Sequence, residues 1–133
     1  VSVSNGQINT EPLKRLLPYI DALNIDLKAF NEDFYNKICN GSFNAVKNTI
    51  KQIVKAGKHI EITLLLIKDY NDNKKEFEKM CKWLSGLSKD IVLHISRAFP
   101  YYKMDFEITP VSLMKDFKDI AKKYLDKVYL GNI

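Results

Sequence analysis

Apolar residues switch repeatedly between two periods along this chain, and this switching restricts its fold more than any other feature. Short runs with strand character are separated by segments with helical spacing. The strand-like runs are 1–4, 22–28, 60–67, 91–95 and 127–130, and the helical segments are 10–17, 42–56, 77–87 and 109–125. Each strand–helix–strand unit is close to the roughly 30 residues of a βαβ crossover. Because such crossovers are right-handed, we expect one α/β domain over residues 1–133, with a parallel sheet covered by helices.

The number of strands limits the closure of that sheet. Five strands cannot form an eight-stranded barrel, which takes about 250 residues, so we expect an arc of a parallel-stranded, TIM-like barrel. The run IEITLLLI at 60–67 is apolar enough to predict a strand buried on both faces. The chain begins at Val1 with VSVSNG, which already reads as a strand entering a turn, so we expect a segment that starts inside a longer protein.

Composition argues against several classes of protein. The net charge of +5 comes almost entirely from lysine, since Arg15 and Arg97 are the only arginines. Bidentate recognition of phosphate favours arginine, so we expect no nucleic-acid partner. No apolar run approaches the ~20 residues of a membrane helix, and no signal-peptide pattern opens the sequence; we therefore expect no membrane partner and a cytoplasmic location. Cys39 and Cys81 match no metal-binding spacing and are predicted to be free thiols.

Polar residues gather where the predicted strands end. Sites in barrel-like α/β proteins form at these carboxyl ends. The residues concerned are Ser4, Asn5, Gly6, Asp26, Lys28, Lys68, Asp69, Tyr70, His94, Ser96, Arg97, Gly131 and Asn132. Together they predict a binding surface at one rim of the sheet.

The Asp26–Lys28 pair and His94 each leave two interpretations open. Asp26 and Lys28 are two residues apart in the stretch NIDLKAF, so on a strand they share one face. They form either a structural ion pair or a ligand site, and the pattern favours neither. His94 is either a satisfied core histidine or, with Arg97 just beyond it, part of a binding site. His59 lies at the opposite end of its strand and is predicted to be a surface residue.

Several stretches together resemble the radical S-adenosylmethionine (SAM) enzymes. They are SNG at 4–6, NIDLKAFNEDFYNKICNG at 24–41, EITLLLIKDYND at 61–72, HISRAFPYYKM at 94–104 and VYLGNI at 128–133. The chain is most similar to the branch related to pyruvate formate-lyase activating enzymes, and within it to the radical SAM member of the AmmeMemoRadiSam system. The resemblance runs from end to end and implies an incomplete (β/α)6 radical SAM barrel, from about the third strand onward.

The resemblance also implies an activity for the parent protein. Radical SAM oxidoreductases bind a 4Fe-4S cluster through C-x-x-x-C-x-x-C and cleave SAM to a 5′-deoxyadenosyl radical. The chain lacks this motif, so we expect it to bind no cluster and to be inactive alone. We expect the motif within the ~60–100 residues upstream of Val1 that two further βα units would occupy. By analogy, a protein glycyl-radical site is one candidate substrate, and flavodoxin or ferredoxin a candidate electron donor.

Site residues carry over from the family motifs one by one. Ser4, Asn5 and Gly6 resemble the T-N-G turn near the amino-acid end of SAM. Asp26-Leu27-Lys28 resembles the D-L-K in which lysine contacts the SAM carboxylate and aspartate helps to hold a monovalent cation. Either His94 or Arg97 falls where the family has its late-strand SAM contact.

The sequence departs from the activating enzymes at four positions. Val3 and Asn24 stand where those enzymes carry aspartate and methionine, and both positions help to form the cation site. Lys68 and Asp69 replace a Pro-Gly pair, which changes the loop there.

Two functions outside this family remain open from the residues themselves. A Schiff-base lyase or aldolase would use Lys28 as its amine, but Asp26 raises a lysine pKa and so disfavours this chemistry. A non-catalytic binding module would use the basic surface and would bind its partner in a salt-sensitive way.

Overall fold

A computed structural model of the chain describes residues 2–4, 22–28, 30–31, 43–99 and 108–132. The described elements are β1 (Ser2–Ser4), β2 (Ala22–Asp26), α3 (Phe43–Lys55), β3 (His59–Leu66), α4 (Lys74–Leu87), β4 (Val92–Arg97), α5 (Val111–Lys122) and β5 (Lys127–Gly131). The helix predicted over 10–17 and the helix cap predicted at Ser42 lie outside the described residues. The other predicted elements are present, with ends within a few residues of those expected.

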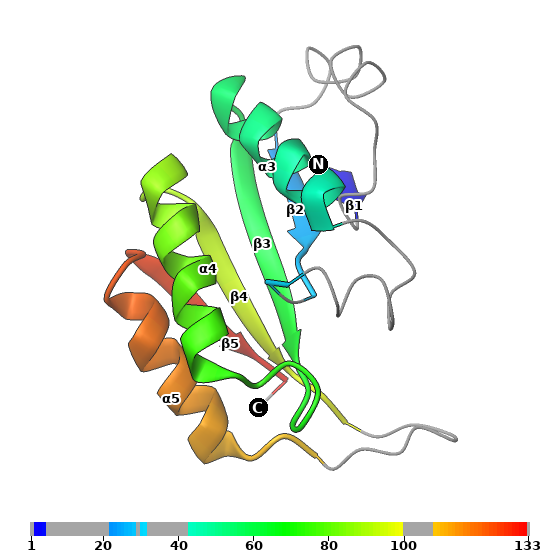
Figure 1. Ribbon diagram of the computed structural model, residues 1–133, viewed down its shortest axis with the longest axis vertical. Coiled ribbons are helices and arrows are strands. Elements are labelled where there is room, and N and C mark those ends of the chain that lie inside the picture. The colour runs from blue at the N-terminus through cyan, green and yellow to red at the C-terminus, as the bar shows by residue number, and fades with distance from the viewer. Residues whose placement is uncertain (1, 5–21, 29, 32–42, 100–107, 133) are drawn as a thin grey trace.

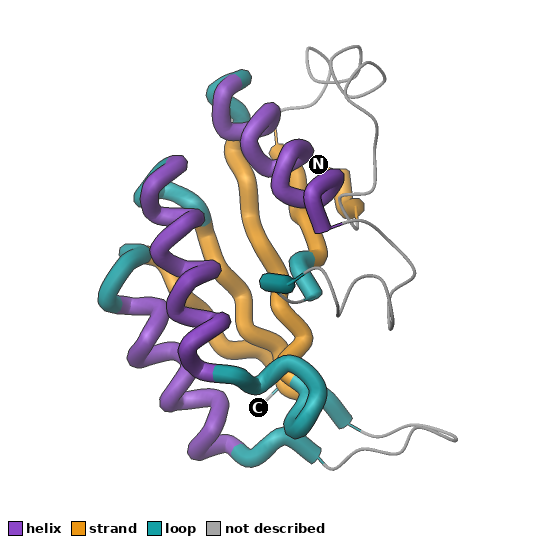
Figure 2. The backbone as a smooth tube through the Cα atoms, viewed as in Figure 1, coloured by secondary structure: helices purple, strands orange, loops and turns teal. Residues whose placement is uncertain are grey.

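The strands form one open, parallel sheet in chain order, β1-β2-β3-β4-β5. Helices α3, α4 and α5 lie side by side over one face of it (Figure 1). The tube view shows the same two layers, with the strands behind the helices (Figure 2). This arrangement confirms the predicted α/β fold, a partial barrel whose sheet is not closed.

The hydrophobic core fills the space between these two layers. Along β2 and β3 every second residue is buried against the helices, because side chains alternate along a strand. The buried strand residues on this side are Leu23, Ile25, Leu27, Ile60, Ile62, Leu64, Leu66, Leu93, Ile95 and Val128. Phe77 of α4 and Phe117 of α5 meet across the helix layer with ring centroids 4.5 Å apart. The core therefore fixes which face of each strand remains for polar residues.

The opposite side of the sheet, here called the open face, corrects one prediction. Burial alternates along β3, so this strand is not buried on both faces as expected. Leu65 is 45% exposed, and Glu61 and Thr63 are partly exposed. No described element covers this face, on which Val92 is buried and Leu65 is the most exposed of the residues named here.

Candidate ligand-binding site at the carboxyl ends of the strands

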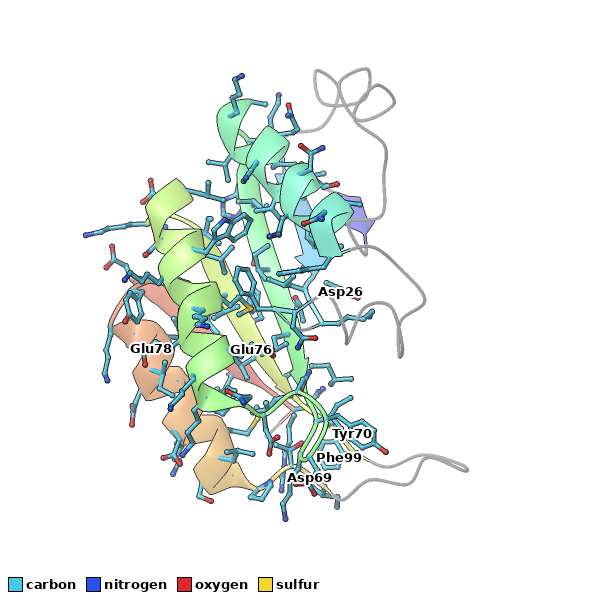
Figure 3. The ribbon with its side chains drawn as sticks, in the orientation of Figure 1. Asp26, Asp69, Tyr70, Glu76, Glu78 and Phe99 are labelled. Carbon is cyan, nitrogen blue, oxygen red and sulfur yellow. The ribbon has the colours of Figure 1, made fainter. Side chains whose placement is uncertain are left out.

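The side chains of Asp26, the last residue of β2, and Lys28, just after it, lie on the open face. Leu23, Ile25 and Leu27 are buried against the helices, Asp26 is partly exposed and Lys28 is exposed. Burial of the three apolar residues fixes the strand's orientation, so the intervening carboxylate and amine are directed away from the core. Figure 3 shows Asp26 near the end of β2.

Register places Asp26 in one row with residues of three other strands. Asp26 pairs with Thr63, Thr63 with His94, and His94 with Tyr129. Adjacent strands lie about 4.8 Å apart, so the backbones at Asp26 and His94 are separated by about 10 Å across the open face. A small polar ligand could lie over Thr63 between these two side chains.

His94 belongs to a polar cluster on the open face. Its Nε2 lies 2.5 Å from Glu61 Oε1, and His59 Nε2 lies 3.2 Å from Glu61 Oε2. The His94 ring also stacks on Tyr129, with centroids 5.7 Å apart and planes inclined at 30°. The hydrogen bond from His94 lowers the pKa of Glu61, the bond from His59 adds to the effect, and burial opposes it. Glu61 therefore remains a carboxylate between two imidazoles.

Sequence reasoning did not single out Glu61. The spacing of His59 and Glu61 was the available signal, because residues two apart on a strand share a face. The contact with His94 depends on the register of β3 and β4, which the sequence does not reveal. His59 is a surface residue as predicted, with 48% of its side chain exposed.

Arg97 lies on the other side of β4 from His94, because the two residues are three apart. Its Nε donates to the Thr109 carbonyl oxygen at 2.6 Å, and its guanidinium lies 5.1 Å from the Phe99 ring centroid. The Thr109 hydroxyl in turn donates to Leu66 O at 2.6 Å. Arg97 thus joins the end of β4 to the segment before α5, at the rim, whereas His94 lies deeper on the open face.

The loop after β3 lies at this rim as well. Figure 3 shows Asp69, Tyr70 and Phe99 grouped beyond the ends of β3 and β4. Tyr70 is 46% exposed. Asn71 is buried, and its side-chain Nδ2 donates to the Lys28 carbonyl oxygen at 2.8 Å. The loop therefore contacts the residue that the family motif assigns to SAM.

The remaining predicted residues are only partly described. Ser4 ends β1 and pairs in register with Ile25, which places it beside the end of β2. Asn5 and Gly6 lie outside the described residues. Of the two cysteines, only Cys81 is described; it is a buried free thiol whose pKa is raised to about 12 by burial.

A pocket of about 350 Å³ lies at the other end of the sheet. Its polar side chains are those of Lys58, His59, Ser88 and Asp90, beside the amino ends of β3 and β4. It is far from the rim that holds Lys28 and Arg97, so we do not assign it to the candidate site.

Within the described ranges, no group of three or more His, Cys, Asp or Glu side chains is arranged to hold a metal ion. No helix in these ranges is long and apolar enough to cross a membrane.

The fold resembles solved radical SAM structures. A domain of a pyruvate-formate lyase-activating enzyme from Bacteroides vulgatus superimposes with a TM-score of 0.85 at 18% identity, covering 98% of this chain and 80% of that one. A radical SAM methyltransferase from Sphaerobacter thermophilus gives a TM-score of 0.78 at 17% identity, covering 97% of this chain and 39% of that one. At these identities the similarity establishes the fold.

Sequence comparison establishes the family. The chain is 37% identical over 136 residues to the Methanocaldococcus jannaschii protein named "Uncharacterized protein MJ0808"; the match covers the whole chain and 40% of that relative. The model of the radical SAM superfamily matches residues 1–84, which include β1, β2, α3 and β3. The chain belongs to the radical SAM superfamily.

Proposed function

We propose that this chain is the later part of a radical SAM oxidoreductase and supplies the groups that hold the amino-acid end of SAM. When bound, SAM and a 4Fe-4S cluster supply a 5′-deoxyadenosyl radical that abstracts a hydrogen atom from the substrate. The observation that carries the proposal is the placement of Asp26 and Lys28 on the open face, at a carboxyl end of the sheet, in a chain of this superfamily.

The residues at this rim fit a zwitterionic ligand. Lys28 presents an exposed ammonium group that can pair with the SAM carboxylate. The Asp26 carboxylate lies on the same face and can pair with the cationic amino group of the ligand. Ser4, with Asn5 and Gly6 after it, supports the same end of the ligand in our proposal.

The two late-strand candidates receive different roles. Nε of Arg97 is fixed by Thr109, which orients the guanidinium plane at the rim, so we assign the second SAM contact to Arg97. His94 is held by Glu61 on the open face, three residues before Arg97 in β4 and in register with Thr63 and Asp26. We place it beside the bound substrate.

Cys81 is poorly suited to bind the 4Fe-4S cluster. A cluster ligand must be a thiolate, and burial keeps the Cys81 thiol protonated, with a pKa of about 12. Because Cys39 and Cys81 also do not form C-x-x-x-C-x-x-C, we propose that the cluster cysteines precede Val1 in the parent protein.

The chain spans 40% of the length of its Methanocaldococcus relative. The substrate is therefore proposed for the full-length protein and not for this chain alone. Similarity to the domain of a pyruvate-formate lyase-activating enzyme supports a protein substrate with a glycyl-radical site. We propose a flavodoxin or ferredoxin as electron donor and a cytoplasmic location.

Binding of SAM to the full-length, anaerobically reconstituted protein tests the function. Lys28→Met removes the ammonium group but keeps a long side chain. Loss of a charge-assisted hydrogen bond worth about 1.5–3 kcal/mol should weaken binding by roughly 10- to 100-fold in isothermal titration calorimetry. The matched control is Lys79→Met, which removes an exposed lysine from α4 on the other side of the sheet.

The proposal predicts that Lys79→Met binds SAM as the wild type does. The wild-type protein should also form 5′-deoxyadenosine from SAM when it is reduced with dithionite. A reconstituted wild-type protein that binds no SAM would refute the function, and unchanged binding by Lys28→Met would refute the role of that residue.

A further inference from the structure

Asn71 is a buried polar residue in the loop between β3 and α4. It is 6% exposed, and its side-chain amide makes three hydrogen bonds. Oδ1 accepts from Ile67 N at 2.7 Å, while Nδ2 donates to Leu65 O and to Lys28 O, both at 2.8 Å. Both N–H donors and the carbonyl oxygen of the amide are therefore in use.

These bonds connect two strands where their backbone ladder ends. Leu27 N donates to Thr63 O at 3.0 Å. One residue further along the chain, just beyond β2, the Lys28 carbonyl accepts from Asn71 Nδ2, which also donates to the Leu65 carbonyl of β3. The amide therefore bridges the ends of β2 and β3 and fixes the backbone from which the Lys28 side chain projects.

The loop is folded tightly around this amide. Tyr70 N and Asn71 N both donate to Ile67 O at 3.1 Å. Asp69 has a φ of 69°, in the left-handed region that residues other than glycine rarely adopt. Such a conformation persists only when the surrounding structure requires it. The sequence of the loop, KDYND, thus brings Asn71 back to the end of β2.

We propose that Asn71 is a positioning residue for SAM, which acts by fixing the backbone of Lys28 so that the ammonium group meets the SAM carboxylate. The inference rests on the proposed function. A lysine side chain is flexible, with about 2 kcal/mol of rotamer entropy. The backbone therefore has to set the direction of its Cα–Cβ bond if the ammonium group is to meet its partner often. Asn71 controls that direction without contacting the ligand.

Two substitutions separate the two halves of the amide. Asn71→Ala removes all three hydrogen bonds. Asn71→Asp is close in shape and retains the acceptor for Ile67 N, but it loses both donors and places a carboxylate against the carbonyls of Lys28 and Leu65. Both variants should lose the hydrogen bond that holds the Lys28 backbone. If Asn71→Ala does not fold, Asn71→Asp still tests the proposal, because it keeps the bond from Ile67 N within the loop.

The test compares two ligands on the full-length, reconstituted protein. Decarboxylated SAM has the sulfonium and the adenosine of SAM but lacks the carboxylate that Lys28 would contact. We expect the Asn71 variants to bind SAM on the order of tenfold more weakly, with little change for decarboxylated SAM. A merely structural role would weaken both ligands equally, and that result would overturn the inference.

Asn73→Ala is the matched control. It removes a side-chain hydrogen bond from the same loop, Glu76 N to Asn73 Oδ1 at 3.0 Å, but this bond does not involve Lys28. We expect its affinity for SAM to equal that of the wild type. If Asn73→Ala weakened SAM binding as much as the Asn71 variants do, general loosening of the loop would explain the effect. A wild-type protein that binds SAM and is insensitive to Asn71 refutes this inference alone, whereas one that binds no SAM refutes the proposed function.

Discussion

At the scale of single residues, Glu61 is the clearest electrostatic feature of the open face. His94 and His59 hydrogen-bond its two oxygens, and the contact with His94 is the main reason that its pKa is lowered. A carboxyl group with a lowered folded-state pKa stabilises the fold above its unfolded-state pKa, and this stabilisation is lost as the pH falls through the folded-state value.

Glu61→Gln should therefore reduce stability at neutral pH, and the reduction should shrink as the pH falls below about 4.3, the ordinary pKa of glutamate. The carboxylate is 35% exposed, so we expect a loss of about 0.5 kcal/mol, as for other solvent-screened pairs. Urea unfolding of the chain at several pH values measures it. A difference between the two proteins that stays constant from pH 7 to pH 3 would contradict the assignment.

Residue spacing predicted part of the geometry of the candidate site. The shared face of Asp26 and Lys28 follows from their separation by two, and burial of Leu27 between them agrees with it. The odd separation of His94 and Arg97 likewise implies opposite faces, once both are known to lie in β4. Asn71 could not be found in this way, because an asparagine in a loop is ordinary turn chemistry and its partner Lys28 lies 43 residues away.

At the scale of elements, α4 begins at a side-chain cap. Asn73 Oδ1 accepts from Glu76 N at 3.0 Å, and Asn73 has an extended backbone, with φ −72° and ψ 112°. The side chain satisfies one of the backbone N–H groups left without a partner at the start of a helix.

Replacing Asn73 with alanine should destabilise the chain by about 1 kcal/mol, measured as a shift of the urea unfolding midpoint with an unchanged slope. Ser85→Ala serves as a comparison, because Ser85 Oγ donates only to the exposed Lys82 carbonyl within α4. Its loss should lie within about 0.5 kcal/mol of zero. Equal losses in the two variants would contradict the capping role.

Periodicity predicted which segments form helices and strands, but it did not predict what covers each face of a strand. The boundaries of α4 and β5 fall close to the apolar patterns that predict them. The error at β3 has a physical cause: an apolar run shows that a strand can be buried on both faces, but burial also requires a covering element. Thr63 and Leu65 suit the interior of a closed barrel, and in this open sheet no described element covers them.

At the scale of the whole molecule, the sheet has two outer strands, β1 and β5. In the described ranges each pairs on one side only. Unpaired N–H and C=O groups at such an edge can pair with a second chain, and charged side chains counteract this. Strand β5 carries Lys127 and the exposed Tyr129, whereas β1 has the uncharged sequence Ser-Val-Ser.

We therefore expect the 133-residue chain to self-associate through β1, with an average mass in multi-angle light scattering that rises with concentration. In Val3→Lys, the β1 strands of both chains carry an added positive charge. These like charges repel where the two strands pair, so association should shift to higher concentrations. Tyr129→Lys, which adds the same charge to β5, should leave the association unchanged. A monomeric mass over a wide concentration range would contradict the prediction, and loss of association in Tyr129→Lys alone would move the contact from β1 to β5.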